Sequence, residues 1–316
     1  MHHAQHALPT SLATSLAATL AGSALLLGAC AGPGHDHESA KRRHDTMILD
    51  QQQRPTGLIF ASVTDTPGGR ESRFAYYVPR IAHEQVTPLP MIVFLNGSGE
   101  CGTDGVRQTT QGLLPAVLNK PEDWPFIIVF PQKPSSDSEW EDHVSLVKAC
   151  MDFVRARYSI DERRVYLTGL SQGGHGTWMI ASMMPGAFAA IAPVCGYGPG
   201  GYGVEADPAS LDKVAASLAD TPVWAFHGDK DDVVPCAQTK SMIDAIRRRR
   251  ESSASLAPAD RQRLAANPLL RMTIYPDLNH GCWDRAYRVG TSTPDAPSES
   301  IAQWFLRFRR DAPTDR

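Results

Sequence analysis

Short runs of apolar and β-branched residues recur along the chain, and the longer segments between them place apolar residues at a helical period. The runs predict eight strands, over 57–63, 73–79, 91–95, 126–130, 165–168, 189–194, 223–226 and 272–275. The runs that begin at 91, 126, 165 and 223 are apolar on both faces. We therefore expect these strands at the centre of a sheet that is covered by helices on each side.

Helical spacing is clearest at Val144, Val147, Met151, Val154 and Tyr158, which step by three and four residues and share one face. Further helices are predicted over 173–184, 236–250 and 298–309. Such alternation of strands and helices is typical of a mainly parallel sheet with right-handed crossovers. Because ligands of these sheets bind in the loops beyond the carboxyl ends of the strands, chemistry is expected in those loops.

The N-terminal segment differs from the rest, since 7–30 contains no formally charged residue and ends in Leu-Leu-Gly-Ala-Cys. An apolar run before small residues predicts a secretory signal over 1–29, although the first six residues lack the usual Lys or Arg. The ending resembles the lipobox of bacterial lipoproteins, which implies lipidation at Cys30. A single transmembrane anchor is the alternative. Both the lipoprotein signal and the transmembrane anchor predict export to the periplasmic or cell-surface side, with the protein held at a membrane surface. In the lipoprotein case the N-terminal lipid would hold it there.

The segment 30–55 is polar and is expected to be a flexible tether before one globular domain over 56–312. Its tract His35-Asp36-His37-Glu38 matches no defined set of metal ligands, so a solvated linker is favoured over a metal site.

Composition narrows the classes of function. The chain of 316 residues has an apolar fraction of 42% and a net charge of −3, which excludes a disordered chain and gives no basic face for a nucleic-acid partner. Its six cysteines form no CxxC pair, so a structural zinc site is not expected, and neither metal nor cofactor is predicted.

The motif that carries chemistry is Gly169-Leu170-Ser171-Gln172-Gly173, between a predicted buried strand and a predicted helix. GxSxG at such a place is the nucleophile elbow, in which a sharp turn exposes the serine hydroxyl. A serine nucleophile also needs a base and a third group that orients the base. A Gly-rich turn without chemistry is the alternative, and the flanking strand and helix argue against it.

On this fold the acid and then the histidine follow the serine. His175 lies one helical turn from Ser171, and His227 precedes every candidate acid, so His280 is the predicted base. The loop His227-Gly-Asp-Lys-Asp-Asp-Val-Val-Pro235 offers three aspartates, between which the residues alone do not choose.

This loop resembles the HGxxDxxVP loop of α/β-hydrolases, chiefly of the carboxylesterase and acyl-protein thioesterase branch and its dienelactone-hydrolase relatives. The resemblance implies that Asp231 is the acid. Asp229 is the second choice, and Asp232 becomes a surface or turn residue.

An acyl-transfer site also needs backbone donors for the oxyanion. One is predicted at Gln172, at the start of the helix, where the dipole favours negative charge. The stretch Phe94-Leu95-Asn96-Gly97-Ser98-Gly99 resembles the family's FLHGxG loop, with Asn96 in place of His. The resemblance implies that the second donor is the amide of Ser98.

The resemblance extends from Gly57 to Arg309 and implies an α/β-hydrolase fold: a mostly parallel eight-stranded sheet with helices on both faces and little or no cap domain. The run Asn279-His-Gly-Cys-Trp283 and the leader are similar to secreted esterases and to the "predicted peptidase" group related to polyhydroxybutyrate depolymerases and feruloyl esterases. Four aromatic residues are candidates for the substrate pocket, with plain packing as the alternative: Trp140, Tyr197, Tyr202 and Trp283.

Four cysteines lie at the edge where the site is predicted, namely Cys101, Cys195, Cys236 and Cys282, whereas Cys150 is expected to be buried. In an exported protein they allow up to two disulfides, in three connectivities. Our hypothesis is a Cys236–Cys282 bond that ties the acid loop to the histidine loop.

Together these features predict a serine hydrolase that cleaves small-molecule or oligomeric carboxylic esters through an acyl-enzyme. A peptidase with the same triad is the first alternative. A binding module that kept the fold without its chemistry is the second.

Overall fold

The computed structural model describes residues 53–65, 69–85, 87–252, 269–287 and 298–311, all within one unit that comprises Arg42–Arg316. The predicted signal over 1–29, the lipidation site Cys30 and nearly all of the tether lie outside the described residues. No helix among the described residues is long and apolar enough to span a bilayer.

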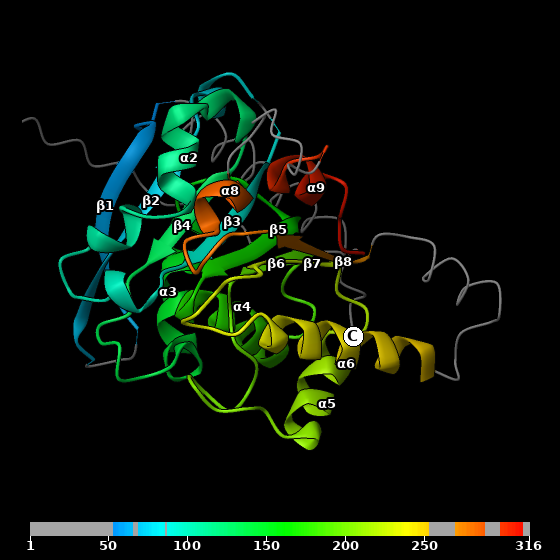
Figure 1. Ribbon diagram of the computed structural model, residues 1–316. Helices are drawn as coiled ribbons and strands as arrows, with labels where there is room; N and C mark the ends of the chain where they lie inside the picture. The colour runs from blue at the N-terminus through cyan, green and yellow to red at the C-terminus, as the bar shows by residue number, and fades with distance from the viewer. Residues whose placement is uncertain (1–52, 66–68, 86, 253–268, 288–297, 312–316) are drawn as a thin grey trace, which may run out of the picture. The chain divides into compact units, whose positions relative to one another are not determined.

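The predicted sheet is confirmed, and its strand bounds differ from the apolar runs by at most two residues except in β5, which begins five residues earlier than its run. Eight strands form one sheet in the order β1-β2-β4-β3-β5-β6-β7-β8 (Figure 1). The pairs β1–β2 and β2–β4 are antiparallel and all other neighbours are parallel. The strands are β1 (Gly57–Thr64), β2 (Glu71–Val78), β3 (Leu89–Leu95), β4 (Ile127–Pro131), β5 (Ile160–Leu170), β6 (Ala190–Val194), β7 (Val223–Gly228) and β8 (Leu270–Tyr275).

Helices cover both faces of this sheet (Figure 1). One face carries α3 (Val144–Arg155), α4 (Gln172–Met183), α5 (Pro208–Ser217) and α6 (Ala237–Ser252). The other carries the shorter α2 (Leu113–Asn119), α8 (Trp283–Tyr287) and α9 (Ile301–Leu306). Short 3₁₀ helices lie in the connections, at η1 (Arg80–His83), η2 (Ser98–Glu100), η3 (Arg107–Thr109), η4 (Pro121–Asp123) and η5 (Trp140–His143).

Strand β3 shows how one strand serves two cores. Met91, Val93 and Leu95 pack into the core under α3, α4, α5 and α6. Ile92 and Phe94 point the other way, into the core under α2, α8 and α9. Every residue of this strand is buried, which explains why its sequence is apolar at each position.

The arrangement gathers six loops at one edge. Strands β3 to β8 run in the same direction, so the segments that follow them emerge together. The segment after β6, residues 195–207, contains no helix or strand, and this leaves the edge without a cap domain at that position.

Candidate active site

The turn between β5 and α4 holds Ser171 in a backbone conformation that few residues adopt, with φ 54° and ψ −120°. Its amide donates to the carbonyl of Val194 at 3.0 Å, which fixes the turn to the end of β6. The neighbouring chain passes so close that a Cβ on Gly173 would lie 2.0 Å from the carbonyl oxygen of Leu95. The GxSxG spacing is therefore a packing requirement as well as a turn signal.

The structure brings the three predicted side chains together from three loops. His280 Nε2 lies 2.8 Å from Ser171 Oγ. His280 Nδ1 lies 2.8 Å from Asp231 Oδ2. The Asp231 side chain is fully buried, and the His280 side chain is 15% exposed. Of these three hydrogen-bonded side chains, it is therefore the Ser171 end that is open to a substrate. This is the arrangement in which an imidazole takes a proton from a serine.

The surroundings of Asp231 keep it ionised. Its Oδ1 accepts from the amides of Val233 at 3.0 Å and Val234 at 2.8 Å. Burial acts most strongly and favours the neutral acid, but hydrogen bonds from His227, His280 and Val234 together hold the pKa of Asp231 well below its usual range.

The other two aspartates of the acid loop lie elsewhere. Asp232 is exposed, as expected of a surface residue. Asp229, the second choice for the acid, is also exposed and accepts from the amide of Asp277 at 2.7 Å. It thus ties the acid loop to the loop that carries His280.

His227 has a part in the site that sequence reasoning missed. It is fully buried, and its Nε2 lies 3.0 Å from Asp231 Oδ2 and 2.8 Å from the carbonyl of Val234. Its Nδ1 lies 2.8 Å from the hydroxyl of Thr239. Because a carbonyl only accepts, Nε2 must carry the proton and donate. The spacing of four residues between His227 and Asp231 was the available signal.

The predicted oxyanion donors lie at the starts of two helices that flank Ser171. Gln172 is the first residue of α4, so its amide has no partner within the helix. Ser98 is the first residue of η2. Asn96 holds the loop before it, because its Nδ2 donates to the carbonyl of Gly97 at 2.6 Å and its Oδ1 accepts from the amide of Lys133 at 3.3 Å.

A cavity of about 500 Å³ opens in front of Ser171 and His280. Three of the predicted aromatic residues line it: Tyr197, Tyr202 and Trp283. The prediction for Trp140 is wrong. Its ring is fully buried against Gly176, and its Nε1 donates to the carbonyl of Asn96 at 3.0 Å, so it supports the loop after β3 from behind.

Two carboxylates line the same cavity, Glu100 and Glu139, and no Lys or Arg is among its described lining residues. Glu139 accepts from the hydroxyl of Tyr197 at 2.8 Å and from Gln172 Nε2 at 3.1 Å. Burial raises the pKa of Glu100 despite hydrogen bonds from the backbone at Gly97 and Glu100. Neither residue was a candidate at the sequence level, since a lone Glu in a loop carries no pattern.

No family model matches the chain, and relatives of similar sequence match it in whole or in part. A bifunctional acetylxylan esterase/xylanase of Neocallimastix patriciarum is 31% identical over 128 residues, 39% of this chain and 17% of that protein. A Salmonella typhimurium protein named as a candidate carboxymethylenebutenolidase is 25% identical over 276 residues, 80% of this chain and 90% of that protein.

Among solved structures, a thermostable esterase superposes with a TM-score of 0.58 at 24% identity, covering 84% of this chain and 64% of that one. The chain has the α/β-hydrolase fold. The predicted fold class, a mostly parallel eight-stranded sheet with helices on both faces, is therefore confirmed. The chain spans less than two thirds of the length of that esterase and a smaller part of the xylan enzyme.

The five cysteines among the described residues are all free thiols, so the expected Cys236–Cys282 bond is absent. The thiol of Cys282 is instead the hydrogen-bond partner of Cys195, and burial raises the pKa of Cys195 well above its usual range. Cys195 is fully buried behind the elbow, which leaves it inert rather than nucleophilic.

Two groups of side chains bring metal-binding atoms within 4.8 Å of one another: Cys195, Asp231 and His280, and also Glu139, Glu141 and His175. In each group the histidine is already hydrogen bonded to a carboxylate, at 2.8 Å in the first and 3.3 Å in the second. His175 also stacks on Tyr197, with ring centroids 4.2 Å apart. These contacts match hydrogen-bonded networks that position side chains better than they match coordination shells.

Proposed function

We propose that this α/β-hydrolase is a serine esterase that cleaves carboxylic esters through a Ser171–His280–Asp231 triad. The observation that carries the proposal is the chain of two 2.8 Å contacts from serine through histidine to a buried carboxylate, at the mouth of a cavity of about 500 Å³. That volume lies in the range of small-molecule sites. Relatives and structural neighbours that are named as esterases support the same reaction class.

The first half of the reaction forms an acyl-enzyme. His280 Nε2 takes the proton of Ser171 Oγ while the oxygen attacks the ester carbonyl. The amides of Gln172 and Ser98 donate to the oxyanion that develops. Asp231 stays a carboxylate, as its low pKa indicates, and stabilises the imidazolium that His280 has become. His280 then gives its proton to the leaving alcohol as the carbon–oxygen bond breaks.

The second half regenerates the enzyme. A water molecule gives one proton to His280 Nε2 and attacks the acyl carbon, and the same amides hold the second oxyanion. Collapse of that intermediate breaks the bond to Ser171 Oγ, which takes back the proton from His280, and the carboxylic acid leaves.

The test is Ser171→Ala, assayed with p-nitrophenyl esters and with a fluorophosphonate probe. We expect kcat to fall on the order of 10⁵-fold to 10⁶-fold and labelling to disappear, as removal of a triad serine does elsewhere. Ser98→Ala is the matched control. Because the proposed donor at position 98 is a backbone amide, this variant should stay within a few-fold of wild type.

Two results would redirect the proposal. Faster turnover of peptide anilides than of matched esters would favour the peptidase alternative, which uses the same acyl-enzyme. Wild-type protein that is folded, but neither hydrolyses esters nor reacts with the probe, would favour a binding module.

A further inference from the structure

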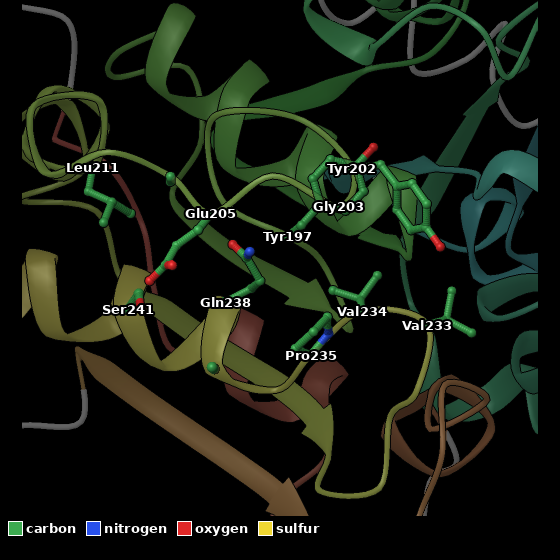
Figure 2. Close-up of a pocket in the computed structure, with 12 residues that line it drawn as sticks. Tyr197, Tyr202, Gly203, Glu205, Leu211, Val233, Val234, Pro235, Gln238 and Ser241 are labelled. Carbon is green, nitrogen blue, oxygen red and sulfur yellow. The ribbon is translucent and has the colours of Figure 1, made fainter.

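A second cavity, of about 330 Å³, lies beside the catalytic one and has no part in the proposed reaction. Tyr197, Tyr202 and Val233 line both cavities, so the two adjoin at these side chains. Figure 2 shows these three residues at one end of the second cavity and Leu211 and Ser241 at the other. The two adjoining cavities together extend from Ser171 to Leu211 on α5 and Ser241 on α6.

The lining of the second cavity is mostly apolar. Leu211, Val234 and Pro235 contribute to its walls, and Glu205 is its one side chain with a formal charge among the described lining residues. At the junction, Tyr202 is 60% exposed and Val233 is 42% exposed. Large apolar side chains that are left uncovered beside a pocket mark a place where apolar surface of a ligand can be buried.

Specific contacts hold this cavity in shape. Gln238 on α6 accepts from the amide of Gly198 at 3.2 Å through Oε1. Its Nε2 donates to the carbonyl of Val204, also at 3.2 Å. The two bonds fasten the loop after β6 to α6 on both sides of Tyr202. The second cavity is therefore preformed, which lowers the entropic cost of binding there.

We propose that the second cavity is a distal subsite, which binds the part of an ester substrate that lies away from the scissile carbonyl. The proposal rests on the esterase function above and adds the substrate class. That class is an elongated ester whose far group has apolar or aromatic surface and is uncharged or cationic, because Glu205 disfavours an anion there. A small acetate would occupy the catalytic cavity alone.

The experiment compares two series of esters of increasing length. Phenylalkyl acetates from benzyl to 4-phenylbutyl extend the alcohol side, and p-nitrophenyl phenylalkanoates of matching length extend the acyl side. We expect kcat/KM to rise about tenfold with length in one series, as the phenyl group reaches the distal subsite. The series that responds identifies the side of the ester that enters.

Ser241→Trp fills the far end of the distal subsite from an exposed position on α6. It should remove the gain for the long esters, so that long and short esters are turned over at similar kcat/KM. Lys240→Trp is the matched control, since Lys240 is the exposed neighbour on the same helix and lines neither cavity. It should leave the dependence on length unchanged.

A binding measurement separates this proposal from the esterase function. Calorimetry on Ser171→Ala with the shortest and the longest ester of each series should give a Kd about tenfold lower for the longer ester in one of the two series, and Ser241→Trp in that background should abolish the difference. If wild type hydrolyses no ester but this difference is found, the esterase proposal fails and the subsite stands. Equal Kd values for short and long esters in both series, or an equal effect of Ser241→Trp on short and long esters, would overturn the subsite.

Discussion

At the scale of single residues, Asp231, the acid of the proposed triad, shows how a buried carboxylate stays ionised. Asp231 has no exposed side-chain surface, yet both of its oxygens accept hydrogen bonds, one from two backbone amides and the other from two imidazoles. Burial alone would have favoured the neutral acid, which could not stabilise an imidazolium. The hydrogen-bond donors outweigh the effect of burial, so the loop Asp231-Asp-Val-Val234 folds back to place its own amides on the carboxylate and keeps it ionised.

The low pKa of Asp231 predicts how stability depends on pH. Its pKa in the folded state lies below the unfolded value of about 3.9, so the folded state binds fewer protons. The contribution of this carboxylate to stability is therefore complete above that pH and is lost as the pH falls through the folded pKa. The difference in unfolding free energy between wild type and Asp231→Asn should be greatest near neutral pH and should shrink below about pH 4.

Denaturant unfolding at several pH values checks this, with Asp232→Asn as the control at the adjacent, exposed position. That control should give no difference that depends on pH in the same way. A difference for Asp231→Asn that stayed constant from pH 7 to pH 3 would contradict the assignment of the low pKa to Asp231.

His227 is expected to position the acid. It donates from Nε2 toward Asp231 Oδ2 and the carbonyl of Val234, and it touches neither Ser171 nor the catalytic cavity. His227→Phe keeps a ring but removes the donor, so we expect kcat to fall by about tenfold or more while KM changes little. His227→Gln retains an N–H of similar reach and should recover most of kcat. Steady-state kinetics of the two variants would decide, and equal loss in both would indicate a packing role only.

At the scale of elements, the elbow depends on how closely α4 approaches β3. A methyl group on Gly173 would lie 2.0 Å from the backbone oxygen of Leu95 in β3. Relieving this clash would require a shift of the backbone of α4 or of β3, which is energetically costly. Gly173→Ala should therefore cost about 3 kcal/mol of stability or more. Gly99→Ala is the matched control, because nothing lies within 4 Å of its added Cβ. Urea unfolding of both variants checks this, and comparable stabilities would show that the elbow is less tightly packed than its geometry indicates.

The sequence predicted the structure best for strands that are buried on both faces of the sheet and for loops whose geometry a motif fixes. All eight strands were predictable because their runs are apolar, and Ser171, Asp231 and His280 because chain order and loop resemblance leave few choices. The helices α2, α5 and α8 were missed, since with seven, ten and five residues they are too short to show a clear helical period. The second cavity and the position of Trp140 depend on how loops pack against one another, and no local pattern encodes that.

At the scale of the whole molecule, charge and shape act in the same direction on the choice of substrate. The chain carries a net charge of −3, and the two formal charges on the wall of the catalytic cavity, at Glu100 and Glu139, are both acidic. Lys133 lies behind this wall, and its ammonium group donates hydrogen bonds to the carbonyls of Ser135 and Ser138. Its positive charge therefore offsets the negative charge of Glu139 only in part. An ester that bears its own carboxylate therefore meets repulsion both during approach and in the cavity.

We accordingly expect neutral esters to be cleaved faster than anionic esters of equal size. For p-nitrophenyl butyrate against mono-p-nitrophenyl succinate, the ratio of kcat/KM should exceed about tenfold at low salt and should narrow as salt screens the charges. Glu139→Gln should lower that ratio several-fold, whereas Glu122→Gln, on the exposed helix η4 and away from the cavity, should not. A ratio that neither salt nor Glu139→Gln altered would mean that shape alone selects the substrate, because an electrostatic preference must respond to both.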